Sequence, residues 1–434
     1  MKYGPEDRGP GVLAHEELTG SSSPLQGVYV WRNMLAKFAL FFFGIALWHK
    51  GLDIFTGSLL TLAWILYDGP RQLGQTIKEP LVLAILIFCA ALLLGILWSG
   101  YPNSGNFRWS KYLGLMIFIP YLSLLNKERL SWAIGGLIVG YSGVLLMGSY
   151  YQFFGEVQGI PPLRMAYLHF SMMLGIGVIV TFYLAAISSN KKVVSLLWLF
   201  AGFLIFMQFN QTGRGPLLAT IPTLALLLFM LYRIQIKKLL GVMAAVIIVM
   251  GVSAYLSNNF HERLSQARSD IELSQQEKYE TSVGYRLAVW DVGLRAIAQR
   301  PWFGYGTGMA KSAFEKTAET YKGGRYKNLT SYIGNLHYHN DMIEIGVYLG
   351  VLGLSAYAFL LWGWFQTLRA HRLTILGTAL VCFIFLAGLT DVIFIYGQIP
   401  SLLLVITAIA IGWQKENGIP MLKEKLSIQS RRRR

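Results

Sequence analysis

Charged side chains are scarce in this 434-residue sequence: Asp, Glu, Lys and Arg make up 14% of it, against 54% hydrophobic residues. So little polar side chain cannot cover a globular protein of this length, which excludes an ordinary soluble fold. Cysteine is also rare, and both Cys89 and Cys382 fall in apolar runs. This usage argues against a disulfide framework, a cysteine metal site and a cysteine nucleophile.

Apolar runs long enough to cross a bilayer recur along the chain, since a helical span needs about 20 mostly apolar residues. The roughly twelve predicted spans are residues 31–48, 51–67, 80–98, 109–125, 131–150, 165–188, 193–209, 215–232, 238–256, 340–364, 373–395 and 399–414. The sequence therefore predicts an all-α polytopic membrane protein. Its transmembrane helices occupy 31–256 and 340–414, on either side of one large polar loop.

The basic residues of the short loops fall in alternate connections, for example Arg71 with Lys78 and Lys191 with Lys192. Because Lys and Arg are retained on the cytoplasmic side, these loops and both termini should lie inside. Residues 1–30 then form a polar cytoplasmic tail, and residues 415–434 a basic one. The net charge of +16 is mostly an orientation signal, so we do not expect nucleic acid as a partner.

The polar loop 257–339 should face outside, which in a bacterium means the periplasm. Its composition predicts a polar helix over 262–278 and an amphipathic helix over 282–300 that Pro301 ends. The expected apolar face of the second helix comprises Val283, Leu287, Trp290, Leu294 and Ile297. The glycines at 304, 306 and 308 lack the spacing of a dinucleotide loop, so we interpret them as a turn in which backbone approaches backbone.

Three arginines near the predicted outer surface are candidate ligands for an anionic substrate. Arg214 lies in Thr212–Pro216, where Thr212 could cap a helix whose positive end would face a phosphate. Arg286 flanks the apolar face of the amphipathic helix, and Arg164 precedes the sixth span. Anchoring in lipid headgroups or simple solvation is the alternative for each of them.

The loop ends in His337-Tyr338-His339-Asn340-Asp341, and a neutral histidine there could take a proton from an acceptor hydroxyl. We expect Asp341 or Glu344 to orient one imidazole. Tyr338 belongs to a basic, tyrosine-rich segment whose composition suits sugar rings and phosphate oxygens, and we expect Tyr338 and Glu344 to contact the substrate. A competing hypothesis is a metal held by both histidines and one carboxylate, supplied by Asp341 or Glu344. We favour a site without metal or other cofactor, because an outer-face reaction without ATP needs a donor such as a lipid-linked pyrophosphate, whose departure arginines can stabilise.

Four motifs occur in order around the loop: Thr212–Pro216, Gly284–Trp290, Pro301–Gly308, and His339–Gly346 with Gly350 and Gly353. With this arrangement the sequence resembles the bacterial O-antigen ligase and polymerase family. The resemblance implies a metal-independent, inverting glycosyltransferase of the inner membrane. Ligases of the family move O-antigen glycan from undecaprenyl pyrophosphate to a sugar hydroxyl of the lipid A core, whereas polymerases extend another lipid-linked repeat.

The resemblance also implies residue roles. It assigns Arg214 and Arg286 to the donor diphosphate and His337 or His339 to the acceptor, with the family's His-Asn pairing favouring His339. Arg164 resembles a further arginine before the sixth span. Two other hypotheses remain at this stage, glycan transfer to protein hydroxyls and a twelve-span transporter. Against the transporter, no second copy of the Arg214 or His339 region is found in the sequence.

Overall fold

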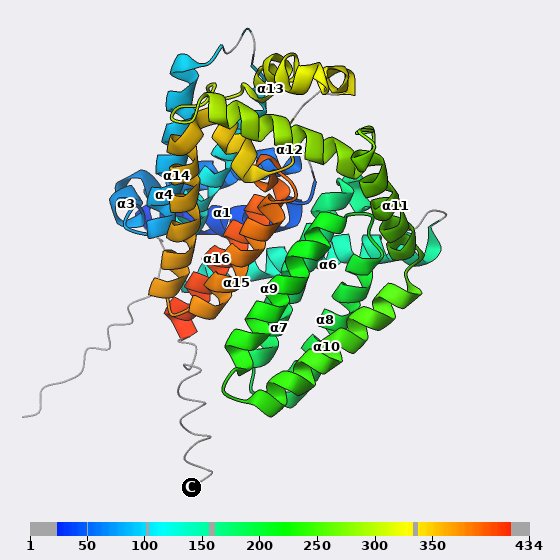
Figure 1. The fold of residues 1–434 in the computed structure, drawn as a ribbon. Helices are drawn as coiled ribbons and strands as arrows, with labels where there is room; N and C mark the ends of the chain where they lie inside the picture. The colour runs from blue at the N-terminus through cyan, green and yellow to red at the C-terminus, as the bar shows by residue number, and fades with distance from the viewer. Residues whose placement is uncertain are drawn as a thin grey trace, which may run out of the picture.

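A computed structural model describes residues 24–49, 51–100, 103, 105–155, 161–332 and 337–417, which form α- and 3-10 helices without a strand in these ranges (Figure 1). The α-helices are α1 (Pro24–Ala46), α2 (Leu52–Leu66), α3 (Gly69–Thr76), α4 (Pro80–Leu94), α5 (Phe118–Leu124), α6 (Lys127–Phe154), α7 (Tyr167–Ile187), α8 (Lys191–Phe209), α9 (Arg214–Tyr232), α10 (Ile236–Leu256), α11 (Asn258–Gln275), α12 (Ser282–Gln299), α13 (Ala310–Ala318), α14 (Asp341–Ala370), α15 (Thr374–Gly388) and α16 (Gln398–Asn417). The 3-10 helices are η1 (Gly95–Trp98), η2 (Phe107–Ile117), η3 (Pro162–Arg164), η4 (Tyr321–Gly324), η5 (Lys327–Tyr332) and η6 (Ile393–Ile395). Most of the two predicted tails, and the side chains of Arg164 and Arg214, lie outside the described residues.

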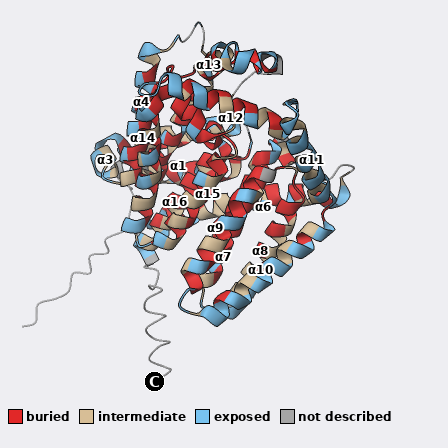
Figure 2. Cartoon of the chain, viewed as in Figure 1, coloured by how far each residue is buried: buried red, intermediate tan, exposed pale blue. Residues whose placement is uncertain are grey.

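Eight of the described helical segments are long and apolar enough to cross a membrane: α4 with η1, and α6, α7, α8, α9, α10, α14 and α16. The apolar helices α2 and α15 are shorter, at 15 residues each. Helix α10 lies on the outside of the bundle and is largely exposed (Figure 2). Its exposed side chains include Ile247 and Ile248, and such an apolar surface suits lipid. The predicted all-α polytopic class is therefore confirmed, while the number of spans stays a prediction.

The two ends of the bundle differ in the connections that they carry (Figure 1). The α7–α8, α9–α10 and α14–α15 connections lie at one end, whereas α11, α12 and α13 form a layer across the other. Lys191, Lys192, Arg233 and Arg372 therefore lie at the end opposite the polar layer. This is the alternation that the basic residues predict, because successive spans cross in opposite directions.

Two predicted spans differ from the structure. Residues 373–395 do not form one helix: α15 ends at Gly388, and the chain is no longer α-helical at Asp391. The Val392 amide donates to Asp391 Oδ1 at 2.8 Å, so it does not continue the helical hydrogen-bond pattern. Residues 109–125 begin in the 3-10 helix η2 and become α-helical only at Phe118.

Helix α12 buries a face shifted from the one predicted: Trp290 and Ile297 pack partly against the core, but two of the predicted leucines do not. Its buried residues include Gly284, Ala288 and Val292, whereas Leu287 and Leu294 are 41% and 59% exposed. The reason is close packing on α14: a Cβ at Gly293 would lie 2.4 Å from the Ile343 side chain. The short side chains let the two helices approach, and the larger leucines are left outside.

The turn at residues 301–308 fills a break in α14. Gly350 is non-helical, with φ 60° and ψ −143°, and the Val351 amide donates to Pro301 O at 2.7 Å. In return the Tyr305 amide donates to Val347 O at 2.9 Å, so backbone pairs directly with backbone. Polar groups freed by a broken transmembrane helix need such partners. The interpretation of the glycine motif as a turn in close backbone contact is thus confirmed.

We expect Gly350→Ala to destabilise the protein strongly. A Cβ at Gly350 would lie 2.3 Å from Pro301 O, and the conformation is one that essentially only glycine adopts, at a cost of about 1–3 kcal/mol for other residues. Thermal unfolding in detergent checks this. Gly143→Ala in α6 is the matched control, because its Cβ would meet no atom within 4 Å. Equal midpoints for the two variants would contradict a strained break.

Candidate active site

The segment before α14 is fixed to the end of α15 through Asn340. Asn340 Oδ1 caps α14 by accepting from the Met342 and Ile343 amides at 3.0 and 3.1 Å. Its Nδ2 donates to Leu389 O at 3.2 Å. His339, which precedes this cap, has φ 48° in the left-handed region. The cap thus joins two helices that are distant in sequence and places His339 at their junction.

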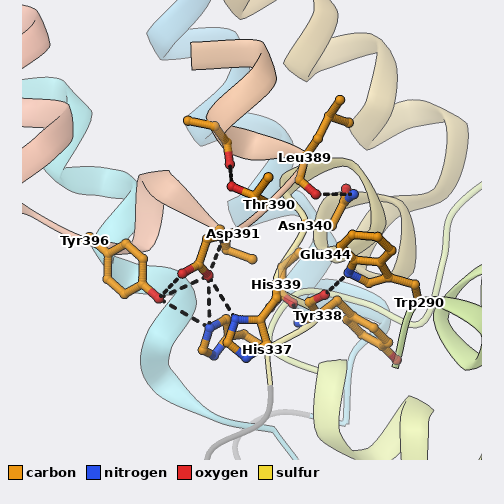
Figure 3. A network of polar contacts seen from close by, with 12 residues as sticks. Trp290, His337, Tyr338, His339, Asn340, Glu344, Leu389, Thr390, Asp391 and Tyr396 are labelled. Atoms are coloured by element: carbon orange, nitrogen blue, oxygen red, sulfur yellow. Dashed lines mark hydrogen bonds and ion pairs between the residues drawn. The ribbon is translucent and has the colours of Figure 1, made fainter. Parts of the chain in front are cut away.

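Tyr338 anchors the same segment from the opposite side. Its amide donates to Glu344 Oε2 at 2.9 Å, and its carbonyl accepts from Trp290 Nε1 at 2.8 Å. The Tyr338 side chain is fully buried and Glu344 is 2% exposed. The expected substrate contacts of Tyr338 and Glu344 are therefore wrong for this conformation. Both residues instead hold the loop while His337 and His339 face Asp391 (Figure 3).

Asp391 is the carboxylate that orients the two imidazoles. His339 Nδ1 lies 3.1 Å and His337 Nε2 3.3 Å from Asp391 Oδ1 (Figure 3). Tyr396 OH is 3.2 Å from both carboxylate oxygens. The expectation that Asp341 or Glu344 would do this is wrong, because Glu344 accepts from Tyr338, and Asp341 Oδ2 accepts from Tyr357 OH at 3.4 Å.

The surroundings of Asp391 and His339 set their charges. Burial alone raises the pKa of Asp391, but hydrogen bonds from His337 and His339 outweigh it, and the net pKa is lowered. Burial also lowers the pKa of His339 below 6.5, and the nearby His337 and Arg286 lower it further, against the raising effect of Asp391. At neutral pH the pair is thus an ionised Asp391 that accepts an N–H from a neutral His339.

This arrangement leaves one nitrogen of His339 free to act as a base. Because Nδ1–H donates to Asp391, Nε2 carries the lone pair, and no described residue hydrogen-bonds it. His339 lines a cavity of about 320 Å³ whose other lining residues are Tyr167, Glu280, Thr281, Ser282, Tyr285, Arg286 and Leu329. The structure therefore combines a neutral base with a fixed cation in one cavity.

Of the three predicted arginines, Arg286 is the one whose side chain the structure places at this cavity. Arg214 is the first residue of α9, and its neighbours pack toward the site. A Cβ at Gly213 would lie 3.4 Å from the Tyr167 ring, and one at Gly215 would lie 2.5 Å from Thr390 Oγ1. The predicted cap by Thr212 is wrong, because Gly213 is the N-cap and no side chain caps the helix.

Three residues of the site were not predicted from the sequence: Asp391, Tyr396 and Arg108. Asp391 had a usable signal, since an ionisable residue inside an apolar run is a candidate functional residue. Tyr396 OH lies 3.3 Å from His337 Nε2, and Arg108 Nη1 lies 3.4 Å from His337 Nδ1. Neither has a sequence signal, because only folding brings them to His337.

His337, His339 and Asp391 are also close enough to share a metal ion, with their candidate ligand atoms within 4.8 Å of one another. The predicted metal alternative placed Asp341 or Glu344 in that role, and the structure contradicts this choice. The same distances fit N–H···O hydrogen bonds, which occupy the nitrogens facing Asp391. Hydrogen bonding accounts for the arrangement without a metal.

The fold and site define an all-α, polytopic membrane protein with a polar cavity at the end of the bundle opposite the basic loops. A family model described as O-antigen ligase matches residues 199–358, which include Arg286 and both histidines. The chain is also 26% identical over 366 residues to the O-antigen ligase of Escherichia coli (strain K12), covering 79% of this chain and 82% of that protein. The chain is therefore similar to O-antigen ligases, and both findings support the family resemblance of its motifs.

Proposed function

We propose that this protein is an O-antigen ligase of the bacterial inner membrane. It transfers glycan from undecaprenyl pyrophosphate to a sugar hydroxyl of the lipid A core, in a cavity that faces the periplasm. The observation that supports this most directly is that His339, which is hydrogen-bonded to Asp391, lines the same cavity as Arg286. The named relative supports the same activity. The orientation rests on the basic loops at the opposite end.

The proposed reaction is a single displacement. His339 Nε2 takes the proton of the acceptor hydroxyl while the hydroxyl oxygen bonds to the anomeric carbon of the donor glycan. The bond from that carbon to the phosphate oxygen breaks, and undecaprenyl pyrophosphate leaves with the electron pair. Attack opposite the leaving group inverts the configuration. Arg286 and Arg214, with Arg164 as a further candidate, stabilise the negative charge that grows on the diphosphate.

The direct experiment uses purified full-length protein, undecaprenyl-pyrophosphate-linked glycan and rough lipopolysaccharide, in buffer containing EDTA. We expect the lipopolysaccharide to gain the mass of the glycan, because arginines replace a metal in this proposal. Elongation of the lipid-linked glycan instead would assign the polymerase activity of the family. Loss of transfer in EDTA, restored by one divalent ion, would overturn the metal-free mechanism.

We expect Arg286→Ala to lower transfer by about 10²–10³-fold, since it removes a fixed cation from the developing charge. The transfer rate of Arg286→Lys should lie between those of wild type and Arg286→Ala, because an ammonium keeps the charge but cannot make the bidentate contact. Arg295→Ala is the matched control: Arg295 is an exposed arginine of the same helix and does not line the cavity. Normal transfer by a folded Arg286→Ala variant would remove Arg286 from the diphosphate site.

A further inference from the structure

We propose that Arg108 makes His337 a positioning residue, so that His339 alone of the two histidines exchanges a proton with substrate. This inference rests on the proposed function and assigns a role to Arg108, which neither the sequence motifs nor the comparisons single out. It is carried by the contacts that join Arg108, His337, Asp391 and His339 in series.

The charge of Arg108 fixes which nitrogen of His337 carries the proton. Arg108 Nη1 lies 3.4 Å from His337 Nδ1, and a guanidinium only donates hydrogen bonds. His337 Nδ1 must therefore accept, which places the ring proton on Nε2. That nitrogen faces Asp391 Oδ1 at 3.3 Å and donates to it. Both ring nitrogens of His337 are thus engaged, and neither is free to act as a base.

Asp391 consequently receives an N–H from each histidine. His337 donates through Nε2 and His339 through Nδ1, and the two rings lie 4.0 Å apart between centroids. His337 lies between Arg108 and Asp391 and connects a permanent cation to a buried carboxylate. The same contacts leave His339 Nε2 as the one unengaged ring nitrogen of the pair within the described residues.

Arg108 is held in place by the glycine turn. The Asn106 side chain accepts from the Arg108 amide at 3.0 Å, and the Asn106 amide donates to Gly308 O at 3.0 Å. Thr307 in the same turn is tied to α4 through Leu92 O at 2.7 Å and to Gly95 O at 3.1 Å. The turn that fills the break in α14 therefore also sets the position of Arg108 relative to the start of α14. This gives the glycine motif a connection to the site.

His337→Gln tests the role of His337, because a glutamine can reproduce both of its contacts: the amide oxygen accepts from Arg108 and the amide nitrogen donates to Asp391. We expect His337→Gln to retain transfer within about 10-fold of wild type. His337→Ala should lower kcat by about 10–100-fold, the loss typical of removing a residue that orients a functional side chain. If His337→Gln were as inactive as His339→Gln, the two histidines would not differ in role and the inference would fail. The proposed function would stand in that case, because wild type would still transfer glycan. If wild type itself transferred no glycan, the proposed function would fail.

Arg108→Met tests whether Arg108 acts through His337. We expect a loss of about 10–100-fold in kcat with little change in KM, and recovery in Arg108→Lys, which keeps a donor-only cation. Lys111→Met is the charge control, because it also eliminates a positive charge from helix η2. The double variant Arg108→Met/His337→Ala should be no worse than His337→Ala, because both changes break one series of contacts. Additive losses would show that Arg108 contacts substrate directly and would overturn the proposal.

Discussion

Replacing His339 by glutamine is expected to lower glycan transfer by about 10³-fold or more, within the upper range of general base catalysis combined with orientation. A glutamine nitrogen can still donate to Asp391, so the carboxylate keeps its partner. What the variant loses is the basic Nε2 that faces the cavity with Arg286. The measurement is the initial rate of transfer from lipid pyrophosphate to rough lipopolysaccharide under saturating donor.

The matched control for this variant is His261→Gln. His261 is exposed on α11, lies 3.3 Å from the Tyr255 carbonyl and does not line the cavity. We expect its transfer rate and thermal unfolding to match wild type. A His339→Gln variant that folds and transfers within about 10-fold of wild type would exclude His339 as the base, since such a base contributes about 10²–10⁴-fold.

Asp391→Asn should produce the second large loss, about 10³-fold in kcat, because a neutral amide lacks the charge that orients the two imidazoles and has one acceptor oxygen in place of two. In serine hydrolases the same change beside a catalytic histidine costs about 10⁴-fold by favouring the wrong tautomer. Asp391 is fully buried, so the thermal unfolding midpoint must be measured alongside the rate. A fully folded variant with normal kcat would contradict the positioning role.

The pH profile separates this role from a purely structural one. His339 must be neutral to accept a proton, so wild-type activity should fall as pH decreases through the lowered pKa of His339, below 6.5. The hydrogen bond that His339 donates to Asp391 raises this pKa against the effect of burial. Asp391→Asn should therefore move the acidic limb of residual activity to lower pH. An unmoved limb would indicate that Asp391 does not contact the active base. Asp68→Asn, at an exposed carboxylate paired with Arg71, should leave the limb in place.

Much of the site could be predicted from residue type and local spacing. Two histidines two residues apart at the mouth of a helix can share one partner, and Arg286 near the start of an amphipathic helix can reach the same cavity. Arg214 next to glycines was expected at a helix start, and the structure has it as the first residue of α9. These predictions concern neighbours in sequence, where helix geometry fixes the relation between positions.

The partners of these residues could not be predicted. Asp391 is 52 residues from His339 and falls within the predicted span 373–395. In the structure α15 ends at Gly388, so Asp391 lies beyond the helix. Arg108 is 229 residues from His337. Tyr338 and Glu344 looked equally suited to a substrate, yet their burial gives them the task of holding the loop. Which polar residue faces a cavity and which faces the core depends on contacts between distant helices.

The sequence by itself determined the class of this protein, because apolar runs of the right length must become helices in lipid, where every backbone polar group needs an internal partner. The order and spacing of its motifs also indicated the family that the chain resembles, and the comparisons with known proteins support this resemblance. Only the tertiary structure decided which carboxylate serves the histidines and which histidine keeps a free nitrogen. Those outcomes depend on where the ends of α14, α15 and η2 meet, and packing between helices, which no local pattern encodes, sets that meeting point.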